Sequence, residues 1–258
     1  MKRPFWQILC ASTIRVIRDL TSTGGDGIIR VTEVQLLSKG LLLASASPRR
    51  QQLFSLLGVP FTSLTADIKE ERGLGEKPEE MVCRLSWAKA KALAEKHPER
   101  LIIAADTIVV LEDQVLGKPA DASEAVTMLR QLRGREHLVF SGLTALSPST
   151  GQQATELART TVWMRPYSDE EIACYVASGD PLDKAGAYGI QHQGFNPVAY
   201  IQGCYASVMG LPLCHLARVL SRLGLTLPVD VPRVCQDFIG HRCSIAKGIL
   251  WRYNDQRM

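Results

Sequence analysis

The sequence lacks a long hydrophobic run. Hydrophobic residues make up 46% of its 258 residues, yet no stretch approaches the roughly 20 consecutive apolar residues of a membrane-spanning helix. The opening MKRPFWQILCASTIRVIRDL begins like a weak signal peptide, but the apolar run is broken and Arg15 and Arg18 follow at once. We therefore expect no membrane partner. The globular pattern begins near Leu41, so residues 1–38 are predicted to be an N-terminal extension, disordered or produced by a start codon assigned too far upstream.

Aromatic residues are also few, and the charge is nearly balanced. Aromatic side chains make up 6% of the sequence, and 30 Lys and Arg against 26 Asp and Glu give a net charge of +4. A basic excess of this size indicates nucleic-acid binding only where the charges cluster. The arginines are dispersed and no row of aromatic side chains offers a stacking platform. We therefore predict no nucleic-acid partner.

The cysteines and histidines show no clear metal-ligand or disulfide spacing. The seven cysteines are scattered and odd in number, which favours a reducing compartment, so we expect a cytoplasmic protein. Cys235, His241 and Cys243 lie close together near the C-terminus, but a fourth ligand at zinc-site spacing is missing. A disordered or loosely packed tail over residues 226–258 is therefore the favoured interpretation.

Strand and helix patterns alternate from Leu41 onward. This alternation is typical of an α/β domain, which we place at residues 39–225. The predicted strands span residues 41–44, 61–68, 101–117 with a turn at 112–114, 136–147 and 152–166. The predicted helices span residues 48–58, 77–98, 122–134, 168–179 and 211–224, and a glycine-rich loop covers residues 186–194.

The first candidate site is LLLASASPRRQQLFSLLG, residues 41–58, where a strand runs into a helix. The free backbone N–H groups and the positive dipole end of a helix start attract anions. Ser45 and Ser47 can add hydroxyl donors, while Arg49 and Arg50 add charge in a forked geometry that suits phosphate oxygens. Taken alone, the segment also fits an N-capping serine followed by solvated arginines.

The second candidate is Asp106, which interrupts the apolar run IIAADTIVV. A carboxylate inside an apolar strand needs a partner or a metal ion. Glu70 and Glu71 follow an earlier strand and can bring a second carboxylate close. Two oxygen ligands completed by water suit Mg²⁺ or Mn²⁺. An aspartate held by backbone donors and a solvated glutamate pair are the alternatives.

The third candidate is the loop PLDKAGAYGIQ, residues 181–191. Asp183 and Lys184 supply charged groups, and the glycines that follow allow the backbone to approach a ligand closely. Lys89, on the long helix, and Lys118, in the segment LGKP, are isolated lysines. A lone lysine is usually a surface charge, so both interpretations stay open for these two residues.

Seven segments occur together in one order: LASASPRRQQLFSLLG, RLSWAKAKA, ADTIVV, LGKP, LRGREH, PLDKAGAYGIQ and VMGLPL. Together they resemble the Maf family of nucleoside triphosphate pyrophosphatases, from Leu41 to Leu223. The resemblance implies an α/β fold with an elongated mixed sheet and flanking helices, in two lobes around a groove. It also implies hydrolysis of a nucleoside triphosphate to the monophosphate and pyrophosphate, a divalent cation, and a homodimer as the assembly.

The resemblance further implies a role for each candidate residue. Asp106 matches a catalytic aspartate that accepts a proton, and Glu70 matches an acidic residue of the groove, so these two carboxylates are the expected metal ligands. The phosphate-binding positions match Ser45, Arg49, Arg50, Lys89 and Lys118, and the positions associated with base selection match Arg49, Thr107 and Gln191. Such a set suits hydrolysis between the α and β phosphates, which requires charge neutralisation and an activated water.

The same resemblance indicates the substrate. The strand carries Asp-Thr and the loop DKAGAYGIQ is intact, as in the branch acting on dTTP and UTP, whereas the branch acting on 7-methyl-GTP has Asp-Gln. Modified pyrimidine triphosphates are further candidates. A regulator of septum formation that binds without catalysis is the alternative from a different class. A pure binder, however, has no need for Asp106 beside a phosphate-binding segment.

Overall fold

The computed structural model describes residues 40–254, so the extension predicted at residues 1–38 lies outside the described residues. The strands in this part of the chain are β1 (Leu41–Leu43), β2 (Phe61–Ser63), β3 (Leu101–Leu111), β4 (Gln114–Leu116), β5 (Glu136–Ser147), β6 (Gln152–Met164) and β7 (Val198–Gln202). They form a seven-stranded sheet in the order β2-β1-β3-β5-β6-β7, and β4 pairs with β3 beside this path. β1 lies parallel to β2 and β3, and the other pairs are antiparallel.

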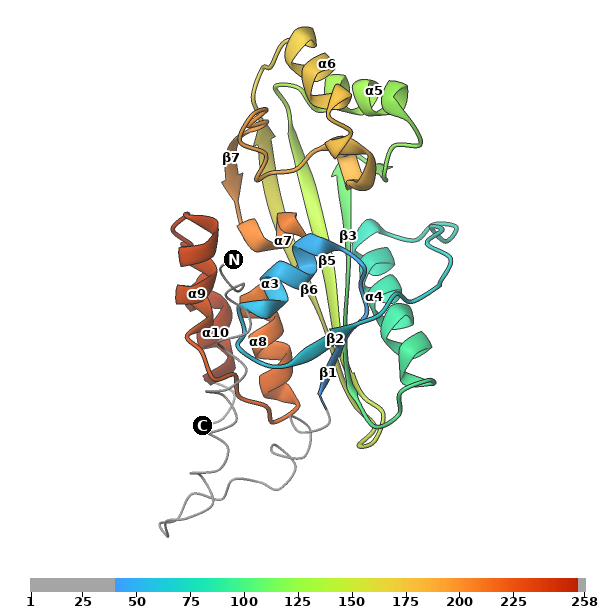
Figure 1. Cartoon of the computed structure of the whole chain (residues 1–258), viewed down its shortest axis with the longest axis vertical. Coiled ribbons are helices and arrows are strands. Elements are labelled where there is room, and N and C mark those ends of the chain that lie inside the picture. Colours follow the sequence, from blue (N-terminus) through green and yellow to red (C-terminus); the bar gives the residue numbers. More distant parts are fainter. Residues whose placement is uncertain (1–39, 255–258) are drawn as a thin grey trace, which may run out of the picture. The chain divides into compact units, whose positions relative to one another are not determined.

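Helices cover both faces and one end of this sheet. They are α3 (Pro48–Ser55), α4 (Pro78–Ala94), α5 (Ala122–Leu132), α6 (Asp169–Ala177), α7 (Tyr205–Met209), α8 (Leu213–Arg222), α9 (Val231–Ile239) and α10 (Ala246–Asn254), with two 3₁₀ turns, η1 (Asp180–Asp183) and η2 (Ala185–Ala187). The long strands β3, β5 and β6 run from the group around α4 and α8 to the group around α5 and α6 (Figure 1). The predicted α/β fold with a mixed sheet and flanking helices is confirmed. None of the described helices combines the length and apolar character needed to cross a membrane.

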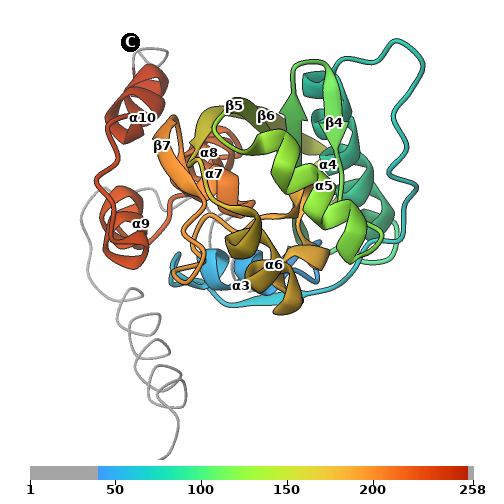
Figure 2. The ribbon, with the colours of Figure 1, turned by 90° about the horizontal axis from the view of Figure 1, so that it is seen from above.

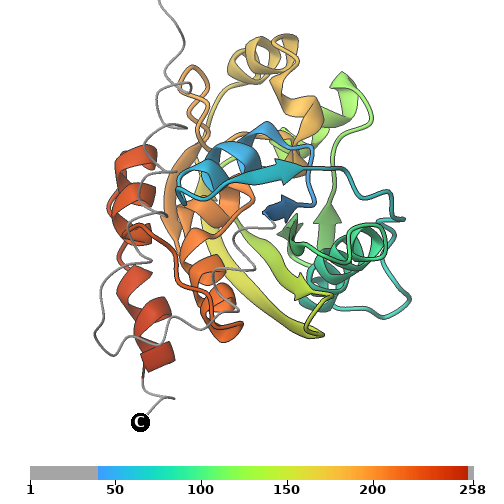
Figure 3. The ribbon, with the colours of Figure 1, turned by 60° about the horizontal axis from the view of Figure 1, so that its bottom comes forward.

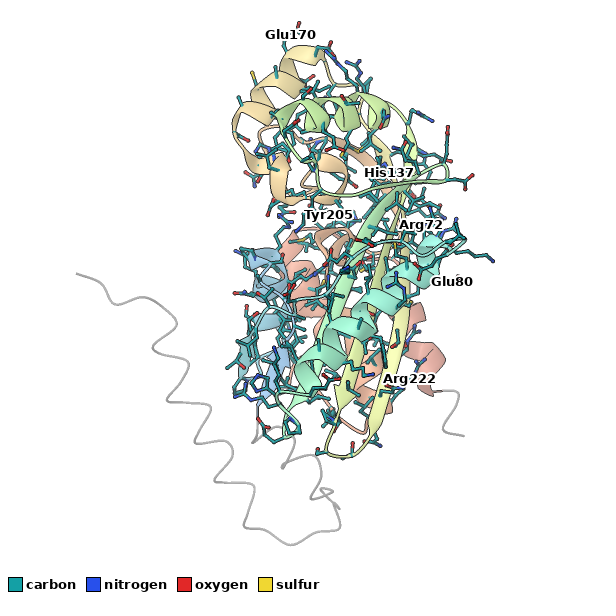
Figure 4. The ribbon with its side chains drawn as sticks, turned by 90° about the vertical axis from the view of Figure 1, so that its right-hand side faces the viewer. Arg72, Glu80, His137, Glu170, Tyr205 and Arg222 are labelled. Atoms are coloured by element: carbon teal, nitrogen blue, oxygen red, sulfur yellow. The ribbon has the colours of Figure 1, made fainter. Side chains whose placement is uncertain are left out.

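Alternate residues of β3 face opposite layers of helices. Ile102 and Ile108 pack in the clusters that contain α4, whereas Ile103 and Val109 belong to the large core that contains α8. Figure 2 shows α4 on one side of the sheet and α7 and α8 on the other, and in Figure 4 α4 lies in front of the sheet. Because side chains alternate along a strand, Asp106 faces the α4 layer and its neighbour Thr107 faces the opposite layer.

One edge of β3 is interrupted in the middle. β1 pairs with residues 101–103 and β4 pairs with residues 109–111, so within the described part of the chain no strand pairs with residues 104–108 on this edge. The other edge is fully paired, since residues 102–110 match β5 without a break. This gap places Asp106 at an opening in the edge of the sheet.

The described part of the C-terminal tail, residues 226–254, forms two packed helices, so the expectation of a disordered or loosely packed tail is wrong there. α9 and α10 lie beside α8 (Figure 3), and Val231 and Cys235 of α9 are buried. Arg218 of α8 donates to both carboxylate oxygens of Glu156 at 2.7 and 2.6 Å, and to the carbonyl oxygen of Ile249 at 2.9 Å. The apolar spacing in each helix covers only a turn or two, too short a pattern to stand out in the sequence.

Gly142 allows α4 to approach the sheet closely. It lies on β5 opposite Asp106, and a Cβ atom at this position would overlap the carbonyl oxygen of Val82 and lie 2.8 Å from the amide nitrogen of Cys83. Both of these atoms belong to the backbone of α4 and cannot rotate away. The lack of a side chain at Gly142 therefore sets the distance between α4 and the sheet at the level of Asp106.

The substitution Gly142→Ala should lower the free energy of unfolding by about 1–3 kcal/mol, because the added methyl group forces α4 away from β5. Urea unfolding measures this loss. Gly248→Ala is the matched control, because Gly248 lies in helix α10 with open space around it. Alanine there should leave stability unchanged or raise it, by up to about 1 kcal/mol. Equal effects of the two substitutions would contradict this account of Gly142.

Candidate active site

The candidate site lies at the gap in the edge of β3. A cleft of about 380 Å³ is lined by the residues predicted for phosphate and base binding: Ser45, Arg49, Arg50, Lys89, Thr107, Lys118 and Gln191, and also by Glu70. Asp106 lines an adjoining cavity of about 600 Å³, and Arg50, Glu70, Lys89, Thr107 and Lys118 line both. The structure thus brings every predicted site residue to one region of the surface.

The segment between β1 and α3 presents an uncapped helix start to the cleft. Pro48 occupies the first turn of α3, and Ser47 precedes it without making a side-chain capping hydrogen bond. The amide N–H of Ser47 instead donates to the hydroxyl of Ser45 at 3.2 Å. The first turn carries no acidic side chain. The alternative of a capping serine does not hold here, and the positive end of the helix remains available to an anion.

Arg50 is fixed by a chain of hydrogen bonds that runs over strands β3 and β5 on one face of the sheet. Its Nε donates to the carbonyl oxygen of Gly210 at 2.9 Å, and its Nη2 donates to Thr107 Oγ1 at 3.3 Å. Ser141 donates to the carbonyl oxygen of Ser207 at 2.9 Å, so Thr107 donates to Ser141 in their 2.9 Å contact. Burial lowers the pKa of Arg50, and the nearby carboxylates oppose that shift. Arg50 is therefore a pre-positioned cation rather than a solvated one.

Lys89 joins the two predicted carboxylates. Its Nζ lies 2.6 Å from Glu70 Oε1 and 2.6 Å from Asp106 Oδ1. The side chains of Lys89 and Asp106 are only 10% and 7% exposed, so the surface-charge interpretation of Lys89 is wrong. Burial favours a higher pKa for Glu70, but the hydrogen bond and charge of Lys89, with the charges of Lys118 and Arg50, outweigh it and hold that pKa below its ordinary value.

The two carboxylates are suitable ligands for a hard divalent cation. Both reach the same point, which the ammonium group of Lys89 occupies in this structure. Oxygen donors of this kind suit Mg²⁺ or Mn²⁺. Among residues 40–254 no group of three or more His, Cys, Asp or Glu side chains gathers to hold a metal. Glu70 and Asp106 would therefore need water or ligand oxygens to complete a coordination shell.

The loop at residues 180–191 faces the phosphate-binding segment across the cleft. Asp183 accepts from Arg49 at 3.3 Å and from Lys184 at 2.7 Å. Lys184 also donates to the carboxylate of Asp180 at 2.8 Å, and Asp180 accepts from the hydroxyl of Tyr175 at 2.7 Å. This network holds the loop in place. It leaves Arg49 paired with a carboxylate that an incoming anion would have to replace.

Gly186 ties the same loop to the segment that carries Lys118. Its N–H donates to the carbonyl oxygen of Gly117 at 3.0 Å, and it adopts a positive φ of 69° with Val109 only 3.0 Å from where a Cβ would lie. Only glycine suits this combination. Lys118 and Gln191 are both exposed at the cleft, so their polar groups are free to meet a ligand from solvent.

Several supporting residues are not evident from the sequence. Tyr175 and Asp180 hold the loop, and the backbone carbonyls of Ser207 and Gly210 hold Ser141 and Arg50. Tyr175 resembles any apolar residue of an amphipathic helix, and a backbone acceptor has no side-chain pattern at all. The segment VMGLPL is one of the shared motifs, but nothing in it predicts that the carbonyl oxygen of Gly210 accepts from Arg50.

The fold and the cleft define an α/β protein in which an uncapped helix start and several cations face a pair of carboxylates. The chain belongs to the Maf-like protein family, which matches residues 40–223, so the predicted membership is confirmed. It is 45% identical over 195 residues to a dTTP/UTP pyrophosphatase of Nitratidesulfovibrio vulgaris, covering 74% of this chain and 92% of that protein. It is 43% identical over 193 residues to a dTTP/UTP pyrophosphatase of Dictyoglomus thermophilum, covering 74% of this chain and 100% of that protein.

Removing the cation between the carboxylates should destabilise the fold. We expect Lys89→Met to lower the free energy of unfolding at pH 8 by about 3–5 kcal/mol, because Asp106 would remain buried without its partner. The double variant Lys89→Met with Asp106→Asn should recover much of this loss. Lys91→Met, an exposed change on the same helix, should stay within about 0.5 kcal/mol of the wild type. A loss below about 1 kcal/mol for Lys89→Met, as for exposed pairs, would contradict the buried cluster.

Proposed function

We propose that this chain is a nucleoside triphosphate pyrophosphatase that hydrolyses dTTP and UTP to the monophosphate and pyrophosphate. The observation that carries the proposal is that the cleft and the cavity adjoining it combine an uncapped helix start, several cations and a pair of carboxylates, of which Asp106 is buried. The similarity to proteins named dTTP/UTP pyrophosphatase supports the choice of substrate. We further propose that the enzyme is cytoplasmic, acts as a homodimer and also accepts modified pyrimidine triphosphates.

The triphosphate would lie between the phosphate-binding segment and the two lysines. Arg50 is already held with its guanidinium at the cleft, so it would meet the phosphates with little reorganisation. Lys118 would supply a mobile charge from the rim. Arg49 would exchange its contact with Asp183 for a phosphate oxygen. Together these groups and the helix start would neutralise charge that builds up during phosphoryl transfer.

Asp106 would position the attacking water. In this step the water oxygen bonds to the α-phosphorus, the bond from that phosphorus to the α–β bridging oxygen breaks, and pyrophosphate leaves with the electron pair. The water proton passes to the carboxylate of Asp106, a general base held within a buried network. Before substrate and cation bind, Lys89 holds this carboxylate in position at the cavity that adjoins the cleft.

Glu70 and Asp106 would hold the divalent cation, Mg²⁺ or Mn²⁺, through one or more oxygens each. When bound, the cation would neutralise phosphate charge and lower the pKa of a coordinated water. Lys89 would then turn its ammonium group from the carboxylates toward the phosphates, a short movement for a flexible side chain.

Gln191 is the residue that we propose to read the base. Its amide offers a donor and an acceptor, which complement the O4 and N3–H edge shared by uracil and thymine. Thr107 already spends its hydroxyl proton on Ser141 and accepts from Arg50. Its part in selection would therefore come from its small size and from the placement of Arg50, and not from a hydrogen bond donated to the base.

Asp106→Asn should reduce hydrolysis of dTTP by at least about 100-fold, the usual contribution of a general base. Phosphate release, measured with added inorganic pyrophosphatase and malachite green, checks this. EDTA should stop wild-type turnover, and Mg²⁺ or Mn²⁺ should restore it. The variant should keep a cooperative urea transition, since Lys89 retains Glu70 as a partner. Wild-type rates in this variant would contradict the assignment of Asp106.

Steady-state kinetics with dTTP, UTP and 7-methyl-GTP distinguish this proposal from a 7-methyl-GTP pyrophosphatase and from a non-catalytic regulator. Wild-type kcat/KM for dTTP and UTP should exceed that for 7-methyl-GTP. Gln191→Ala should reduce the ratio of kcat/KM for dTTP and UTP to that for 7-methyl-GTP by an amount equivalent to about 1–3 kcal/mol. The reason is that the O4 and N3–H edge of the pyrimidine would lose its amide partner. A preference for 7-methyl-GTP would place the chain in the other branch. The absence of hydrolysis of every triphosphate, with binding retained, would favour the regulatory alternative.

A further inference from the structure

A separate cavity of about 310 Å³ lies beside the cleft and is partly walled by α9. It shares Ile190, Gln191 and Met209 with the cleft, so the two spaces meet at the residue proposed to read the base. Phe238 and Ile239, at the end of α9, form part of the far wall. The family match ends at residue 223, so this wall lies outside the segment that the family model covers.

α9 is anchored firmly enough to act as a wall. Its N-terminus is capped by Asp230, whose carboxylate accepts from the N–H of Arg233 at 3.1 Å. Val231 and Cys235 are buried on one side of the helix. Beyond its C-terminal end, the N–H of Cys243 donates to the side chain of Gln236 at 2.8 Å.

Phe238, in contrast, remains 43% exposed although it lies on a helix with a buried apolar face. An aromatic ring left at the mouth of a cavity offers a flat surface on which a base can stack. The other lining groups are mixed: the amides Gln52, Gln191, Gln193 and Asn196, and the apolar or aromatic Met209 and Tyr205. In Figure 4 Tyr205 lies where the part around α5 and α6 meets the rest of the fold.

Amides that hydrogen-bond to ring edges, combined with an aromatic surface, are the groups that recognise a nucleobase. We propose that α9 is a base-binding element of this chain, in which Phe238 and Ile239 close the base end of the site and Phe238 contacts the pyrimidine ring held by Gln191. This inference rests on the proposed function. It adds to that function a contact surface from outside the shared family segment.

The test separates base binding from triphosphate binding. Phe238→Ala should raise KM for dTTP and UTP by about tenfold, the usual loss when an aromatic stacking partner is removed. It should leave kcat within about twofold and leave unchanged the inhibition constant of inorganic tripolyphosphate, a competitor without a base. Phe238→Tyr should restore the wild-type KM, because it keeps the ring.

Tyr200→Ala is the matched control, since Tyr200 is an exposed aromatic residue on β7 that lines none of the cavities described above. It should change neither KM nor the tripolyphosphate constant. An unchanged KM in Phe238→Ala would overturn the inference while leaving the proposed function intact. A parallel rise in KM and in the tripolyphosphate constant would also overturn it, because that pattern indicates general damage to the site. A wild-type chain that hydrolyses neither dTTP nor UTP would contradict the proposed function itself.

Discussion

The ammonium group of Lys89, held between the carboxylates of Glu70 and Asp106, is the interaction on which the site depends. A buried carboxylate is costly without a cation, and Asp106 lies in the middle of an apolar strand with little exposure. The gap between β1 and β4 opens the sheet at this carboxylate. The fold can therefore keep reactive charges out of bulk water and still admit a ligand.

The packing around this cluster serves to hold it. Gly142 lets α4 approach β5, which brings Lys89 within reach of Asp106. On the opposite face of the sheet, the chain of hydrogen bonds through Ser141 and Thr107 fixes Arg50. Two adjacent residues of β3 therefore face opposite layers: Asp106 carries the carboxylate on the α4 side, and Thr107 orients the guanidinium of Arg50 on the other side. A small shift of either layer would separate charges that the proposed chemistry needs together.

The sequence predicts the residues of the site better than it predicts the residues that hold them in place. Asp106 stands out because a carboxylate within an apolar strand is rare, and the serine-arginine segment stands out at a strand-to-helix junction. Lys89 has no local pattern, since its partners come from residues far away in the chain; only the resemblance pointed to it. Tyr175 and Asp180 lie close together in the chain, but a tyrosine on an amphipathic helix has no feature that predicts a hydrogen bond to a loop carboxylate. The packing of the tail is not predicted because α9 and α10 are short, and because Arg218, which binds the carbonyl oxygen of Ile249 in α10, lies on another helix.

A crystal structure with Mg²⁺ and a dUTP analogue whose α–β bridging oxygen is replaced by an imido group would test the central claim most directly. The account predicts phosphates bound to Arg50 and Lys118, a metal ion at Glu70 and Asp106, and uracil at Gln191 beside Phe238. A nucleotide bound with its phosphates away from the gap in β3, or with Lys89 still between the carboxylates and no metal ion there, would contradict it.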